Sequence, residues 1–191
     1  TQLRRASFDL LGLPPTPAAL EAFELDSAPG AWERAIDTLL AQPQHGERWA
    51  RHWLDVARFG ESSGFEHDYD RPGAHHFRDF VIKALNADMP YDQFVQVQLT
   101  GRRSNERTQM SATGHRSQRE PRPGDVFALG FLSRGAGSDP QELAMNAVDT
   151  ISSTFLGMTV ACAKCHDHMF DPVSQANYYS MKALFDPLVL R

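Results

Sequence analysis

The stretch ERWARHWLDVARF, residues 47–59, carries the clearest structural pattern in the chain. Its apolar residues recur at spacings of four, three and one positions, so that they fall on one face of an α-helix. These residues are Trp49, Trp53, Val56 and Ala57. His52 and Asp55 lie beside this apolar stripe. The spacing predicts an amphipathic helix that packs through its two tryptophans.

The same helical periodicity continues on both sides of this stretch, and the sequence contains no clear pair of strands. Thr16 followed by Pro17 is typical of a helix start, and Gly12 of a helix end. Pro43 is expected to end the helix that precedes it. These signals predict an all-α fold, an irregular multi-helix domain with long loops. The other predicted helices cover residues 3–11, 17–25, 31–40, 75–85, 90–99, 139–158 and 175–185.

The composition is ordinary for a globular domain. The chain has 191 residues, of which 41% are hydrophobic and 23% are charged, and this length suits a single domain over residues 1–191. The net charge of −5 argues against general nucleic-acid binding. No apolar run approaches the roughly 18 residues that a transmembrane helix needs, so none is expected.

Residues 101–124 differ from the rest of the chain. They contain six arginines, no aromatic residue and no apolar periodicity. A nucleic-acid-binding arm is the alternative for such a basic run, but this run offers no aromatic side chain on which a base could stack. The composition therefore favours a flexible surface insertion.

The only two cysteines lie in the sequence Cys162-Ala163-Lys164-Cys165-His166. This is the C-x-x-C-H pattern of c-type haem attachment. Two thiols at this spacing can each bond one vinyl group of the same porphyrin, and the adjacent imidazole then serves as the proximal iron ligand. The motif predicts one covalent haem c, held by Cys162 and Cys165 with His166 on the iron.

Three other interpretations of the motif stay open. A Cys-x-x-Cys pair can act as a thiol–disulfide redox couple, although such pairs usually follow a strand, and no strand is expected here. Cys162, Cys165, His166 and His168 are also possible zinc ligands, although structural zinc sites usually draw on two separated clusters. The third interpretation is a small structural disulfide.

His52 is the leading candidate for a sixth, distal iron ligand, with a histidine satisfied by a nearby carboxylate as the alternative. Met169 follows His166 too closely to reach the other face of a haem. His52, Asp55 and Arg58 also suggest an enzyme site that acts on an unknown substrate. The acidic residues that follow them lack the ligand spacing of a calcium loop, and a solvated loop is expected.

Four segments together resemble the planctomycete-type cytochrome c domain family. They are LLGLPPTP (10–17), GERWARHWLDVAR (46–58), RDFVI (78–82) and CAKCHDHMFDP (162–172). Met169 stands where the family usually has lysine, and residues 101–124 also depart from its pattern.

The resemblance implies a domain of a larger exported bacterial protein, and together with the motif it predicts a c-type haem-binding domain for electron transfer. For the alternative of an enzyme domain, it suggests a carbohydrate-like substrate. It implies neighbouring cytochrome and C-terminal domains in the same polypeptide as partners, and a periplasmic or otherwise extracytoplasmic location. The chain has no initiator methionine and no signal peptide. Since haem c is normally attached outside the cytoplasm, we expect the chain to be a fragment of a longer precursor.

Overall fold

The computed structural model describes residues 2–64, 68–103, 122, 124–133 and 139–187. Over these residues the protein consists of helices and connecting loops without a β-strand, and the only strand-like feature is an isolated bridge between Ser62 and Asp70. The predicted all-α fold is confirmed. The insertion predicted over residues 101–124 lies largely outside the described residues.

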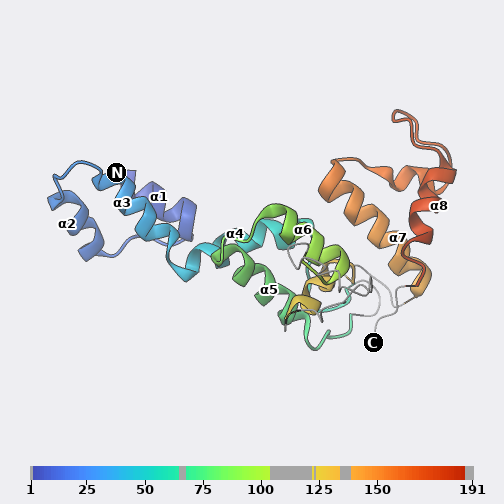
Figure 1. The fold of residues 1–191 in the computed structure, drawn as a ribbon, viewed down its shortest axis with the longest axis horizontal. Coiled ribbons are helices and arrows are strands. Elements are labelled where there is room, and N and C mark those ends of the chain that lie inside the picture. The colour runs from blue at the N-terminus through green and yellow to red at the C-terminus, as the bar shows by residue number, and fades with distance from the viewer. Residues whose placement is uncertain (1, 65–67, 104–121, 123, 134–138, 188–191) are drawn as a thin grey trace, which may run out of the picture.

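The helices lie in three groups along an elongated molecule (Figure 1). The groups are α1–α3 at one end, α4–α6 with η1 in the middle, and α7 and α8 with two short turns at the other end. Their bounds are α1 Gln2–Leu11, α2 Pro17–Leu25, α3 Ala31–Leu40, α4 Pro43–Val56, α5 Ala74–Asn86, α6 Tyr91–Thr100, η1 Asp125–Phe131, α7 Pro140–Ile151, η2 Ser152–Leu156, η3 Val160–Lys164 and α8 Gln175–Ala183.

The predicted helix boundaries hold to within two residues except around Pro43 and at the end of α7. Thr16 caps α2 by accepting a hydrogen bond from the Ala19 amide, as its sequence signal predicts. Pro43 does not merely end α3, which stops at Leu40, but occupies the first position of α4. Proline suits that position because its missing N–H would have no partner in the first turn of a helix. α4 therefore begins four residues earlier than predicted and ends at Val56 instead of Phe59.

The packing face of α4 agrees with the predicted one only in part. Its small and aliphatic residues face the neighbouring helices, and these are Gly46, Ala50, Leu54 and Ala57. Trp49 and Val56 are instead exposed by 43% and 46%. The small residues allow close approach, since the Gly46 amide donates to the Asn86 side chain at the end of α5. Trp53 alone of the predicted stripe's large residues packs against the central core.

α7 ends earlier than the predicted limit of residue 158, because its regular hydrogen bonding changes at Ser152. The chain continues as a single π-helical turn, η2, and leaves it through Gly157 with a left-handed φ of 63°. The Ser153 hydroxyl donates to the carbonyls of Asp149 and Thr150. Such back-bonding competes with the helical ladder and favours a local change of pitch.

One contact from the end of α4 ties the middle group to the third group of helices. Arg58 adopts a left-handed φ of 55°, which turns the chain out of the helix. Its guanidinium donates a 2.8 Å hydrogen bond to the carbonyl of Asn146 in α7. The turn thereby brings a positive charge next to α7.

Candidate functional site

The two cysteines lie on a short turn whose other residues anchor it to the protein. Val160 and Ala163 are buried in an apolar cluster with Val148 of α7 and Tyr178 of α8. Cys162 and Cys165 are exposed and unbonded. The turn closes through a hydrogen bond of 3.3 Å from the Cys165 amide to the Cys162 carbonyl. The fold thus presents both thiols to solvent on an anchored turn.

His166 is exposed, and its ring has one engaged nitrogen. Nδ1 lies 2.7 Å from the carbonyl oxygen of Asp167. A carbonyl only accepts hydrogen bonds, so in the neutral ring Nδ1 carries the proton and Nε2 retains its lone pair. Metal-bound histidines commonly have their second nitrogen engaged in this way.

His168, the second histidine after the cysteines, has a different environment. Its side chain is only 7% exposed. Nδ1 accepts a hydrogen bond of 2.8 Å from the amide of Asp171, and the amide of Phe170 lies at 3.3 Å. The His168 amide in turn donates to the Val173 carbonyl. This ring folds the loop that follows the motif.

Helix α8 holds the motif from the side. The amide of Gln175, the first residue of α8, donates to the Asp167 carboxylate at 2.7 Å. The Gln175 side chain and the Tyr179 hydroxyl both donate to the Lys164 carbonyl, at 3.2 and 3.1 Å. A capping box between Ser174 and Asn177 fixes the start of α8. The residues on both sides of the Cys165–His166 pair are therefore bound to one helix, Lys164 through its backbone carbonyl and Asp167 through its side chain.

A buried polar pair lies beneath the cysteine turn. The hydroxyl of Tyr178, which is 2% exposed, donates to the carboxylate of Asp149 at 3.3 Å. Burial raises the pKa of Asp149, while the Tyr178 hydrogen bond and the charges of Arg58 and Lys164 act in the opposite direction. Burial and the neighbouring Asp149 carboxylate raise the pKa of Tyr178. Tyr178 therefore stays protonated and neutral at physiological pH.

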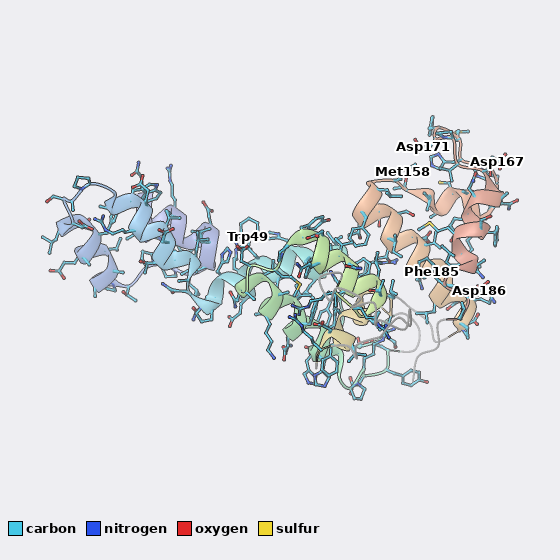
Figure 2. All side chains as sticks on the ribbon, viewed as in Figure 1. Trp49, Met158, Asp167, Asp171, Phe185 and Asp186 are labelled. Atoms are coloured by element: carbon cyan, nitrogen blue, oxygen red, sulfur yellow. The ribbon has the colours of Figure 1, made fainter. Side chains whose placement is uncertain are left out.

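The tip of the loop after the motif carries two exposed apolar side chains. Met169 and Phe170 are 79% and 87% exposed. Figure 2 labels Asp167 and Asp171 on this loop, at the end of the molecule that α7 and α8 form. The apolar tip and the exposed thiols thus belong to the same end of the protein.

His52 is not brought to the motif in this structure. It is exposed on α4, with its ring 5.3 Å from that of Trp49. Figure 2 labels Trp49 on α4, well separated from Asp167 beside the motif. Asp55 and Arg58 lie on or just after α4 as well, and both are exposed. The role of His52 as a second iron ligand stays a prediction, and this arrangement gives it no support.

The large aromatic side chains of α5 and Trp53 of α4 belong to the core. Phe77 and Phe80 of α5 are buried, and Trp53 packs with Phe94 and Phe131. The Trp53 indole donates a 2.7 Å hydrogen bond to the buried Gln98 side chain. Of the acidic loop, Glu61 pairs with Arg78, while Glu66 lies outside the described residues.

A zinc site and a disulfide gain no support from this arrangement. Over the described part of the chain, no three His, Cys, Asp or Glu side chains are grouped so that they could hold a metal ion. The two thiols are not bonded to each other. What the described side chains offer at the motif is two open thiols and one imidazole lone pair.

A family model matches residues 1–189, and its description reads PSCyt2, protein of unknown function (DUF1549). The chain belongs to the PSCyt2 family. No curated protein and no solved structure matches it. In this PSCyt2 chain, none of the helices that the structure describes is long and apolar enough to cross a membrane.

The donor set of this PSCyt2 chain fits a c-type haem. Covalent attachment needs two reactive thiols at this spacing, and both are exposed and unpaired. The proximal ligand needs a neutral imidazole with one free nitrogen, which the Asp167 carbonyl secures for His166. The motif itself was evident from sequence. The supporting role of Asp149, Gln175 and Tyr179 could not be predicted from sequence, because these residues belong to no recognisable motif and come near the cysteine turn only in the folded protein.

Proposed function

We propose that this protein is a c-type haem-binding domain that transfers electrons within a larger exported redox protein. The observation that carries the proposal is the state of the motif: two open thiols on an anchored turn, next to an imidazole whose Nδ1 is engaged and whose Nε2 is free. Bound haem would supply an iron centre that accepts and releases one electron.

The protein's own residues would attach and orient that group. Cys162 and Cys165 would each hold the group through one thioether bond, with the thiol S–H added across a vinyl group of the porphyrin. His166 would offer Nε2 to the iron, because the Asp167 carbonyl engages Nδ1. α8 holds Asp167 and Lys164, on either side of the Cys165–His166 pair, through Gln175 and Tyr179.

The test is expression of the chain in an exporting host together with a cytochrome c maturation system. We expect a haem band that stays with the polypeptide under denaturing conditions, and a pyridine haemochrome spectrum of one haem with two thioether bonds. A folded chain that carries no covalent haem would exclude the proposal.

Matched variants separate the three motif residues. Cys162→Ser and Cys165→Ser should each move the haemochrome α band to longer wavelength, because one vinyl group stays conjugated with the porphyrin. His166→Ala should keep attached haem but change the ligand-sensitive bands of the untreated protein. His52→Ala serves as the control and should leave haem content unchanged, since His52 lies on α4 away from the motif.

The wider context belongs to the same proposal. Covalent haem attachment supports a periplasmic or otherwise extracytoplasmic location, and the family resemblance supports electron exchange with neighbouring domains of the same polypeptide. Fractionation of cells that express the complete precursor tests the location. Haem-stained protein in the cytoplasmic fraction alone would contradict it.

A further inference from the structure

The two histidines on either side of Asp167 meet hydrogen-bond partners of opposite kind. Nδ1 of His166 faces the Asp167 carbonyl at 2.7 Å, and a carbonyl only accepts. Nδ1 of His168 faces the Asp171 amide at 2.8 Å, and an amide N–H only donates. In their neutral forms the two rings therefore carry their protons on different nitrogens.

One further contact of His168 needs to be weighed. A carboxylate oxygen of Asp171 lies 3.4 Å from the same Nδ1, which would suit a protonated Nδ1. The amide contact, at 2.8 Å, is 0.6 Å shorter than the carboxylate contact at 3.4 Å. An N–H group directed at Nδ1 requires a lone pair on that nitrogen. The Phe170 amide at 3.3 Å points to the same form. The proton of neutral His168 is thus on Nε2.

Asp167 connects His166 to the start of α8. Its carboxylate accepts the Gln175 amide at 2.7 Å, and its carbonyl holds the His166 ring, also at 2.7 Å. A carboxylate is favoured at the N-terminus of a helix, where the amides of the first turn lack backbone acceptors. The helix therefore fixes Asp167, and Asp167 fixes the imidazole.

We infer that Asp167 is the positioning residue of His166, holding it as the Nδ1–H tautomer with Nε2 free, and that His168 is a loop-forming residue of the opposite tautomer and not a second ligand. The statement about iron rests on the proposed function. The tautomers do not, because they follow from the protein's own hydrogen bonds.

The decisive measurement is made on the haem-free chain. Long-range ¹H–¹⁵N spectra of the histidine rings, at a pH where both rings are neutral, distinguish the two tautomers directly. We expect Nδ1–H for His166 and Nε2–H for His168. Asp167→Ala should turn the His166 signals into the averaged pattern of a tautomer mixture, with His168 unchanged, whereas Asp167→Asn should keep the wild-type pattern because its side-chain oxygen still accepts the Gln175 amide.

Asp186→Ala is the matched control. Asp186 pairs with Lys182 near the other end of α8, as its position relative to Asp167 in Figure 2 illustrates. This variant weakens the helix without touching Asp167, and the His166 pattern should persist. Loss of the pattern in Asp186→Ala, or its survival in Asp167→Ala, would overturn the inference.

The haem-loaded chain provides a second measurement. Removing a partner that orients a ligating histidine typically weakens metal binding by about 10–100-fold. Added imidazole should therefore displace His166 from the iron at about 10-fold lower concentration in Asp167→Ala than in wild type. If no haem attaches, the proposed function fails, and the spectra of the haem-free chain still decide the role of Asp167.

Discussion

Burial and the nearby positive charges shift the pKa of Asp149 in opposite directions. The Tyr178 hydroxyl donates a hydrogen bond to one of its carboxylate oxygens. Burial raises the pKa of its carboxyl above the ordinary 3.8, so ionised Asp149 costs folding stability at neutral pH. Because a raised folded-state pKa means stability is lost as pH rises, this cost fades as the pH falls toward 3.8.

Asp149→Asn should therefore be more stable than wild type at neutral pH, because it removes the charge and keeps an oxygen for Tyr178. The advantage should shrink on acidification through the folded-state pKa of Asp149. Urea unfolding from neutral pH down to about pH 4 measures it. Asp26→Asn is a control of opposite sign: the Arg34 hydrogen bond lowers the pKa of Asp26, so this variant should lose a little stability at neutral pH and match wild type in acid. An advantage of Asp149→Asn that grows in acid would contradict the prediction.

Gln98 is a fully buried polar side chain whose amide oxygen and nitrogen are both hydrogen-bonded. Its oxygen accepts from Trp53, and its nitrogen donates to the Phe94 carbonyl. Gln98→Met keeps similar volume but leaves the buried Trp53 indole N–H unpaired, which should lower the free energy of unfolding by about 1–3 kcal/mol. Denaturant midpoints with an unchanged m-value would measure this, and Gln96→Met on the same helix is the matched control. Equal stability of the Gln98 and Gln96 variants would refute it.

At the scale of elements, α8 is joined to α7 by a lysine inside the protein. Lys182 is 5% exposed, and its ammonium donates to Gln141 of α7 at 2.6 Å and to Asp186 at 2.5 Å. The Lys182 charge is thus compensated by one carboxylate, while Gln141 contributes only a dipole. Because Asp186 is 44% exposed, water screens part of this interaction.

Asp186→Ala should destabilise the protein more than Lys182→Met does. The first change leaves a buried charge without its counter-charge, whereas the second removes the charge and keeps the apolar stem. Asp186→Ala should cost less than the roughly 3–5 kcal/mol seen when a fully buried ion pair is broken, because Asp186 is partly solvated. Thermal unfolding of the two single variants and the double variant gives the comparison. A larger loss in Lys182→Met would show that the hydrogen bond to Gln141 dominates.

Local signals at helix ends could be predicted from sequence because the chemistry that produces them is local. Thr16 and Gly12 mark boundaries that the structure has at the same residues. The packing face of α4 could not be predicted in this way, because Trp49 is more apolar than Gly46 and yet the neighbouring helices select the small residues that allow close approach. The π-turn after Ile151 depends on serine back-bonding, which apolar periodicity does not register.

Across the whole molecule, the helices bury their apolar residues in separate clusters, so that groups of helices can differ in their free energy of unfolding. The cluster of α1–α3, built on Leu3, Leu11 and Leu39, shares no member with the central cluster around Phe77 and Phe131. Among the described contacts, α1 connects the first group to α4, where the His45 ring lies 3.2 Å from the Leu10 carbonyl. Regions with few shared apolar contacts can open without global unfolding.

Leu39→Ala should therefore destabilise α1–α3 selectively, by about 2–5 kcal/mol for a buried leucine. Native-state hydrogen exchange should show faster exchange in α1–α3 and unchanged protection in α5 and α8. Ala147→Gly in α7 gives the converse comparison, because that residue belongs to the central cluster. Uniform loss of protection in Leu39→Ala would mean that the chain unfolds as one unit.

The candidate site depends both on one contiguous motif and on residues that lie far from that motif in the sequence. The Cys162–His166 motif is contiguous, so sequence alone could identify it as a candidate. The residues that support it come from α7 and α8, and their meeting depends on the burial of Val160, Ala163 and Tyr178 in one cluster. The haem assignment stays a prediction until spectra of the expressed protein decide it.

The exposed side chain of Met169 is open to oxidation. Met169 is 79% exposed, whereas the other described methionines, Met89, Met145, Met158 and Met181, are partly buried. Of these five, Met169 is the one that dissolved peroxide reaches most readily, and sulfoxide formation would turn an apolar tip polar. If the proposed electron transfer takes place near dissolved oxygen, sulfoxide should accumulate first at Met169, which lies three residues after His166. Mass spectrometry of the purified protein would detect it.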